Sequence, residues 1–168
     1  KTADYTEWAI PGSLHVDAYD ALKANDPNAL AAVDLPSDKP IVTVCGAGKV
    51  SLIAAEQLRK RGLPALSLEG GMKAWSLAWN SAAVDVADSA AQVIQVRRTG
   101  KGCLSYLIGS NGVAAVIDPA LPPDVYLALA QENNWQIPHI FDTHIHADHL
   151  SRPRQLAAAS DATLYLPA

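Results

Sequence analysis

The stretch IVTVCGAGKVS, residues 41–51, decides the fold of the N-terminal half of this sequence. Its first four residues, three of valine or isoleucine and one threonine, favour a short strand buried on both faces. After a loop with two glycines, residues 51–61 repeat apolar side chains at the spacing of one helix face: Leu52, Ala55 and Leu58. A second apolar run follows at residues 65–68. Strand, loop, helix and strand predict a βαβ unit and hence an α/β fold with a parallel sheet.

Cys45 lies directly after the predicted strand, just ahead of the predicted helix. Thiolate, the nucleophilic form of cysteine, is favoured by backbone amides and by a helix N-terminus. Gly46 and Gly48 allow the loop amides to turn inward around an anion, and Lys49 adds a positive charge. The loop therefore predicts a nucleophilic cysteine. The alternative is a buried structural cysteine before a glycine-rich turn.

Two other loop chemistries do not fit these residues. A phosphatase loop of the form Cys-x5-Arg needs arginine at position 51, which is Ser51. A Walker loop needs its first glycine where Thr43 stands and a magnesium-binding hydroxyl where Val50 stands. Both phosphate-handling interpretations are therefore disfavoured.

Three separated motifs in residues 5–80 resemble the rhodanese family. They are Glu7-Trp8 with residues 10–15 (IPGSLH), the loop Cys45–Ser51, and residues 68–75 (LEGGMKAW). The resemblance implies that Cys45 takes up sulfane sulfur as a persulfide, and that the surrounding loop binds the substrate: Gly46, Ala47, Gly48, Lys49, Val50 and Ser51. Val50 replaces the arginine of many members, so anion recognition is expected to rest on Lys49 and the backbone. The strand that normally precedes Glu7 is absent, and the sequence is expected to begin inside the domain.

The second half of the sequence has a different pattern. Residues 81–91 are small and polar, which is typical of a linker between a domain at 1–80 and a second at 92–168. Strand-like runs flanking turns, including Asn111-Gly112, predict an antiparallel meander. A helix from Pro123 and a strand at 139–142 are expected to follow.

Residues 143–149, THIHADH, follow that last strand. Imidazole and carboxylate side chains so close together suit zinc or non-haem iron. The candidate metal-binding residues are His144, His146, Asp148 and His149. Asp118, before Pro119, is either an acid that supports this site or a turn residue.

The H-x-H-x-D-H pattern with Ile117-Asp118-Pro119 resembles the metallo-β-lactamase superfamily, over the opening half of its αββα fold. Within it, Thr143-His144 with Ala147-Asp148-His149 and Ser151 is most similar to persulfide dioxygenases, although Arg152 replaces their usual glycine. That resemblance implies Fe(II), with zinc as the alternative, and His144 as a ligand. The other three residues are then ligands or supports of ligands. The remaining ligands would lie beyond Ala168, so we expect little metal binding by this chain.

Composition restricts the partners. The net charge of −4 and scattered basic residues argue against nucleic acid. No apolar run approaches the ~20 residues that cross a bilayer, and no signal pattern is present, so no membrane partner and a cytoplasmic location are expected. The two cysteines, Cys45 and Cys103, fit free thiols in a reducing compartment. Homo-oligomerisation stays open.

Three functions remain from the sequence. The first is a sulfur-oxidation fusion, in which persulfide made at Cys45 from thiosulfate, glutathione persulfide or a similar donor is oxidised to sulfite by the metal domain. The second joins the rhodanese domain to a zinc hydrolase of the hydroxyacylglutathione type. The third is a non-catalytic sulfur carrier.

Overall fold

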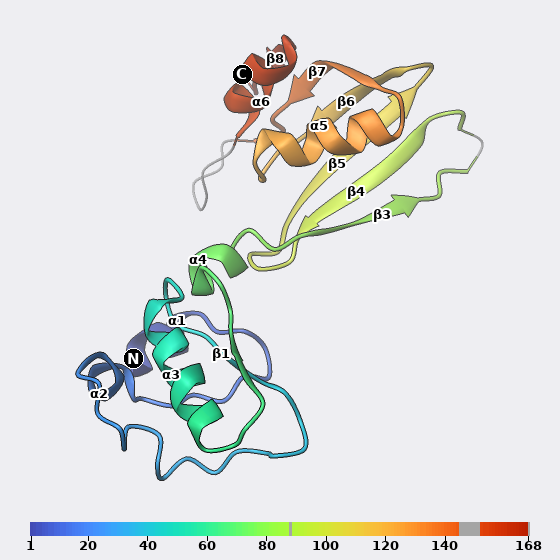
Figure 1. The fold of residues 1–168 in the computed structure, drawn as a ribbon. Helices are drawn as coiled ribbons and strands as arrows, with labels where there is room; N and C mark the ends of the chain where they lie inside the picture. The colour runs from blue at the N-terminus through green and yellow to red at the C-terminus, as the bar shows by residue number, and fades with distance from the viewer. Residues whose placement is uncertain (88, 145–151, 168) are drawn as a thin grey trace. The chain divides into compact units, whose positions relative to one another are not determined.

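The computed structural model describes residues 1–87, 89–144 and 152–167 of the chain. It divides into two compact units, Lys1–Ser76 and Leu77–Ala168. The first contains a two-stranded parallel sheet and the second a six-stranded mixed sheet, each with helices (Figure 1). This confirms the predicted α/β class and its parallel sheet.

The first unit is built around the predicted βαβ segment. Its elements in chain order are α1 (Thr2–Glu7), α2 (Tyr19–Lys23), β1 (Ile41–Thr43), α3 (Lys49–Lys60), β2 (Ala65–Ser67) and α4 (Gly71–Trp75). β1 and β2 pair in parallel, with Thr43 opposite Ser67. The connection between them is α3, as the sequence predicts.

The buried face of α3 differs from the predicted one. Leu58 is 2% exposed and Ala55 is fully buried, as expected, but Leu52 is 49% exposed. Ser51, only 3% exposed, lies on the buried face with Ala54. Apolar spacing alone missed this polar residue, because its partners come from distant parts of the chain.

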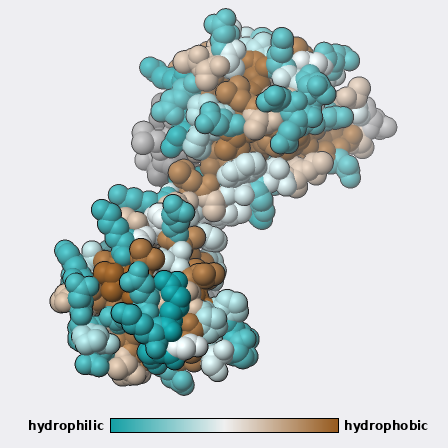
Figure 2. All heavy atoms as spheres, in the orientation of Figure 1, coloured by the Kyte–Doolittle hydropathy of each residue, from teal (hydrophilic) through white to brown (hydrophobic). Residues whose placement is uncertain are grey.

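The prediction that both strands of this unit are buried on two faces is wrong for the described residues. Val42 and its register partner Leu66 are 55% and 59% exposed. α3 packs on one face of the two-stranded sheet, and side chains alternate between faces, so the outward pair meets solvent. Apolar side chains are accordingly visible at the surface of this unit (Figure 2).

The N-terminal segment is less regular than expected. The alanine-rich residues 18–33 form only the short α2 followed by turns. The Asp26 carboxylate accepts a hydrogen bond from the Asn28 amide, a local turn that competes with helix. Residues 14–16 form neither helix nor strand.

The second unit begins as the predicted meander and continues as parallel strands. Its elements are β3 (Asn80–Val84), β4 (Gln92–Arg98), β5 (Cys103–Ser110), β6 (Val113–Ile117), α5 (Pro123–Glu132), β7 (Gln136–Phe141), α6 (Pro153–Ser160) and β8 (Thr163–Tyr165). Strands β3, β4, β5 and β6 pair antiparallel in succession, whereas β7 pairs in parallel with β6 and β8 in parallel with β7. Asn111 and Gly112 both have positive φ, 51° and 81°, as a type I′ hairpin turn requires.

The segment predicted as a linker, 81–91, is partly strand. Residues 81–84 belong to β3, which pairs with β4 over five residue pairs from Asn80 to Val84. Every residue of β3 is exposed, so its composition resembles that of a linker although the strand pairs with β4 along its whole length at the edge of the sheet. The division into domains at 1–80 and 92–168 stays a prediction.

The core of the second unit lies between its sheet and the helices α5 and α6. It gathers fully buried side chains from the central strands and both helices, among them Val96, Leu107, Val116, Tyr126, Ile140 and Leu156. α6 contacts β7 and β8, and α5 contacts β7. None of the helices in the described part of the chain is long and apolar enough to cross a membrane.

Candidate functional site

Cys45 lies in the tight loop between β1 and α3. Gly48, the residue before the first turn of α3, has φ +82°. A Cβ atom there would lie 2.8 Å from the Gly70 nitrogen and 3.2 Å from the Leu68 oxygen, so glycine satisfies both backbone conformation and space. The loop can therefore curl back above the start of the helix.

The sulfur of Cys45 accepts hydrogen bonds from this curled loop. The Ser51 amide lies 3.4 Å from Sγ. The Ser51 hydroxyl and the amides of Ala47 and Gly48 are further hydrogen-bond donors beside the sulfur that favour its charged form. Burial raises the pKa of the Cys45 thiol, but these hydrogen bonds outweigh burial, and the pKa lies below its usual value. The site favours the nucleophilic thiolate.

The segment that follows β2 fixes the loop from the other side. The Met72 amide donates to the Cys45 carbonyl at 2.8 Å, and the Lys73 amide donates to the Gly46 carbonyl at 3.1 Å. A Cβ atom on Gly71 would overlap the Cys45 carbonyl oxygen and come within 2.6 Å of the Gly48 nitrogen. The carbonyls of Cys45 and Gly46 therefore point toward α4, and the amides of the cysteine loop can turn toward the sulfur.

The six predicted substrate-binding residues are not all placed alike. Gly46 and Ala47 are exposed at the loop surface, Gly48 is partly buried, and Ser51 is buried beneath the sulfur. Lys49 is exposed at the first position of α3. Val50 packs against the hydrophobic cluster of the first unit. The substrate-binding roles stay predictions.

Asp118 and Thr143 meet at the edge of the second sheet. β6 and β7 run in parallel with Ile117 opposite Phe141, so the residues after both strands emerge side by side. The Asp118 carboxylate accepts hydrogen bonds from the Thr143 amide and hydroxyl, both at 2.7 Å. Asp118, with φ +50°, is therefore both a turn residue and an acid that holds the start of the histidine segment.

This contact fixes the protonation of the His144 ring. Thr143 Oγ1 lies 2.8 Å from His144 Nδ1. Its single proton goes to the Asp118 carboxylate, so the hydroxyl oxygen accepts from Nδ1–H. In the neutral ring Nε2 then carries the lone pair, the form that binds a metal ion.

The rest of the predicted metal site lies outside the described residues. This applies to His146, Asp148 and His149. Within the described ranges, no group of three histidine, cysteine or acidic side chains is placed to hold a metal. Thr143 and Arg152 both hydrogen-bond the loop after β6. Thr143 bonds Asp118, and the Arg152 amide donates to the Pro119 carbonyl at 2.9 Å. The donor types of residues 144–149 and the oriented His144 ring fit a divalent metal.

Sequence reasoning missed the side chains that support both sites. Tyr126 is fully buried, and its hydroxyl accepts from the amides of Ala120 and Leu121 at 2.9 and 3.2 Å, which fixes the loop that begins at Asp118. Ser67 hydrogen-bonds Ser51. Neither has a sequence signal, because a single tyrosine or serine in an apolar element is not distinctive.

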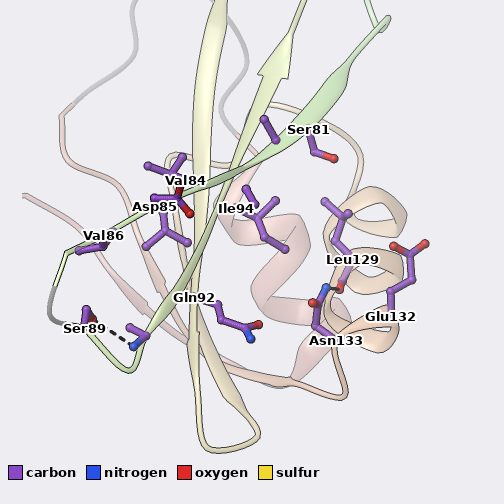
Figure 3. Close-up of a pocket in the computed structure, with 14 residues that line it drawn as sticks. Ser81, Val84, Asp85, Val86, Ser89, Gln92, Ile94, Leu129, Glu132 and Asn133 are labelled. Carbon is purple, nitrogen blue, oxygen red and sulfur yellow. Dashed lines mark hydrogen bonds between the residues drawn. The ribbon is translucent and has the colours of Figure 1, made fainter.

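A groove of about 610 Å³ lies elsewhere in the second unit. Residues of β3, β4 and their connection form one side, and Leu129 and Glu132 of α5, with Asn133 directly after the helix, form the other (Figure 3). Of the predicted catalytic and metal-binding residues that the structure describes, neither Cys45 nor His144 lines it.

Two family models match the chain in succession. The model of the rhodanese-like domain matches residues 1–78, and that of the metallo-beta-lactamase superfamily matches residues 98–168. The chain therefore joins a rhodanese-like domain to a region of the metallo-β-lactamase superfamily. These domain types indicate an enzyme, and the second fold implies a divalent metal.

Each of three curated relatives matches less than half of the chain. A tRNA sulfurtransferase from Desulfurococcus amylolyticus is 36% identical over 69 residues, 41% of this chain and 12% of that protein. A hydroxyacylglutathione hydrolase from Anaeromyxobacter dehalogenans is 41% identical over 66 residues, 39% of this chain and 26% of that protein. Another of that name from Rhodospirillum rubrum is 43% identical over 51 residues, 30% of this chain and 20% of that protein. The chain thus spans between 12% and 26% of the length of these relatives.

Solved structures show a partial likeness. A metallo-beta-lactamase from Staphylococcus aureus has a TM-score of 0.45 and 34% identity, covering 48% of this chain and 24% of that one. ETHE1 from Myxococcus xanthus has a TM-score of 0.36 and 28% identity, covering 51% of this chain and 34% of that one.

Proposed function

We propose that the first domain transfers sulfane sulfur through a persulfide on Cys45, and that the second oxidises a low-molecular-weight persulfide to sulfite with bound Fe(II). The observation that carries the proposal is the Cys45 sulfur, which accepts a hydrogen bond from the Ser51 amide at 3.4 Å and whose pKa is lowered by neighbouring donors. Such donors stabilise a thiolate and the terminal sulfur anion of a persulfide alike. Thiosulfate and glutathione persulfide are the donors we propose.

The transfer balances in two steps. The Cys45 thiolate attacks the outer sulfur of thiosulfate, a new S–S bond forms, and the old S–S bond breaks with its electron pair leaving on sulfite. An acceptor thiolate such as glutathione then attacks the outer sulfur of the Cys45 persulfide. The products are glutathione persulfide and the Cys45 thiolate, so no external oxidant is needed.

The second domain would consume that product. One glutathione persulfide, one O2 and one water give glutathione and sulfurous acid. His144, with His146, Asp148 and His149 as further ligands or their supports, would hold Fe(II), which would supply the activation of O2 when bound. Asp118 and Thr143 orient the His144 ring for this binding. The persulfide shared by both halves favours this combination.

Mass spectrometry of Cys45 tests the first half of the proposal. After incubation with thiosulfate or glutathione persulfide, the Cys45 peptide should gain the mass of one sulfur atom, and added thiol should remove it. A Cys103→Ser variant should behave like the parent and serves as the control. Sulfur transfer that continues in Cys45→Ser would show that another group carries the sulfur.

A zinc-dependent thioester hydrolase is the second candidate for the metal domain. Two curated relatives of the chain carry the name hydroxyacylglutathione hydrolase. Zinc content with hydrolysis of glutathione thioesters, and no O2 uptake with glutathione persulfide, would favour this function over the oxidation.

A further inference from the structure

Ser67 lies on the face of β2 that is turned toward α3. Its register partner on β1 is Thr43. The preceding residue of β2, Leu66, points to the opposite face of the sheet and is 59% exposed. A serine on the covered face of a short strand leaves a polar group that needs a partner. Ser67 finds that partner in Ser51.

Two hydroxyls from the strands converge on Ser51. Ser67 Oγ donates to Ser51 Oγ at 2.9 Å, and Thr43 Oγ1 donates to the Ser51 carbonyl at 2.7 Å. Ser51 is 3% exposed, so water does not compete for these bonds. The Ser51 hydroxyl has one proton, and with Ser67 donating to its oxygen, that proton is left for another acceptor. The Ser51 side chain is among the groups that lower the pKa of the Cys45 thiol, so we infer that the sulfur is that acceptor.

We propose that Ser67 is a positioning residue of the cysteine site, whose hydroxyl orients the Ser51 hydroxyl toward the Cys45 sulfur. The functional meaning rests on the sulfur transfer proposed above. A thiolate accepts but does not donate hydrogen bonds, so ionisation of Cys45 gives the chain Ser67 to Ser51 to Cys45 a single direction. Hydrogen bonds aligned in this way strengthen one another.

Charged side chains near the loop act less directly. Lys49 on α3, Lys73 on α4 and Glu69 between β2 and α4 are all exposed. Solvent screens their effect on the sulfur. The buried hydroxyls are therefore the groups whose removal should change the thiol most selectively.

The test is the pH dependence of Cys45 alkylation by iodoacetamide, measured on the whole chain in a Cys103→Ser background. Ser67→Ala should raise the pH at which the rate inflects. At neutral pH the thiolate fraction should fall by about twofold to tenfold, the effect of a weakened hydrogen bond to a charged group. Leu66→Ala, on the opposite face of the same strand, is the control and should leave the inflection in place.

Two further comparisons separate orientation from general structure. Ser67→Thr and Ser67→Val match in shape, so only the valine variant should lose the effect of the hydroxyl. In a Ser51→Ala background, Ser67→Ala should add nothing, because its partner is already missing. An unchanged inflection in folded Ser67→Ala and Ser67→Val, or additive effects of the two serines, would overturn the inference.

The measurement does not depend on the function. If Cys45 carries no sulfur but the inflection moves as expected, the orientation by Ser67 stands and the proposed sulfur transfer fails. If sulfur transfer needs Cys45 but the inflection does not move in Ser67→Ala, the proposed sulfur transfer stands and the orientation by Ser67 fails.

Discussion

The Cys45 thiol couples its ionisation to the stability of the first unit. Its pKa is lowered in the folded chain, since burial, which raises it, is outweighed by donors from Ser51, Ala47 and Gly48. A lowered pKa means that the folded state favours the thiolate. The stabilisation is therefore fully present above the pKa of an unfolded cysteine, ~8.5, and is lost as the pH falls through the folded value.

The difference in unfolding free energy between the parent and Cys45→Ala should consequently change with pH. We expect the unfolding free energy of the parent to increase relative to that of Cys45→Ala as the pH rises from the thiol pKa of the folded state to that of the unfolded state. Urea unfolding at several pH values under reducing conditions measures this. Cys103→Ala is the matched control, and an equal slope for parent and Cys45→Ala would contradict the direction of the pKa shift.

Gly71 can be tested against a glycine of similar backbone conformation. Gly71 and Gly62 have φ of +56° and +80°, but an added Cβ on Gly62 meets nothing within 4 Å, whereas one on Gly71 strikes the cysteine loop. Either change to alanine should cost about 1 kcal/mol through backbone strain. Only Gly71→Ala should also displace the loop amides and reduce the rate of Cys45 persulfide formation. The reduction should be about tenfold or more, the effect of losing one hydrogen-bond donor to a reacting anion. Equal activity of the two variants would contradict this geometry.

At the scale of the element, α3 carries two leucines on opposite faces. Leu58 is 2% exposed and belongs to the hydrophobic cluster of the first unit, whereas Leu52 is 49% exposed. Leu58→Ala should destabilise the unit by about 2–5 kcal/mol, the cost of a core cavity. Leu52→Ala should cost about 0.5 kcal/mol or less. Thermal unfolding of the two variants tests which face of α3 is buried. If the face predicted from the apolar spacing were buried, both substitutions would be costly.

The same helix shows what the sequence could and could not predict. The order strand, loop, helix and strand followed from local patterns and is confirmed, and so is the meander with its Asn111-Gly112 turn. The polar Ser51 on the buried face of α3 could not be predicted, because Ser67 and Thr43 join it through the sheet. β3 was missed because exposed strands lack apolar alternation.

At the scale of the whole molecule, the candidate sites depend on contacts between segments far apart in sequence. Cys45 and the glycine motif at 70–71 were recognisable separately, but the bonds from Met72 and Lys73 to the loop carbonyls appear only in the fold. Asp118 and Thr143 meet because two parallel strands end at one edge. Residue type and spacing thus predict which groups are reactive, whereas their support comes from topology.

The proposed fusion predicts two different dependences of O2 uptake on Cys45. Thiosulfate with glutathione must first be converted to glutathione persulfide at Cys45, whereas glutathione persulfide supplied directly enters the second reaction without it. In Fe(II)-loaded protein as its gene encodes it, Cys45→Ser should abolish O2 uptake with the first mixture and leave uptake with the second unchanged. An oxygen electrode with parallel sulfite determination measures both, and Cys103→Ser is the control. Removal of iron by a chelator should stop both uptakes while leaving persulfide formation on Cys45 intact. Uptake from thiosulfate and glutathione that persists in Cys45→Ser would show that the two domains do not share this intermediate.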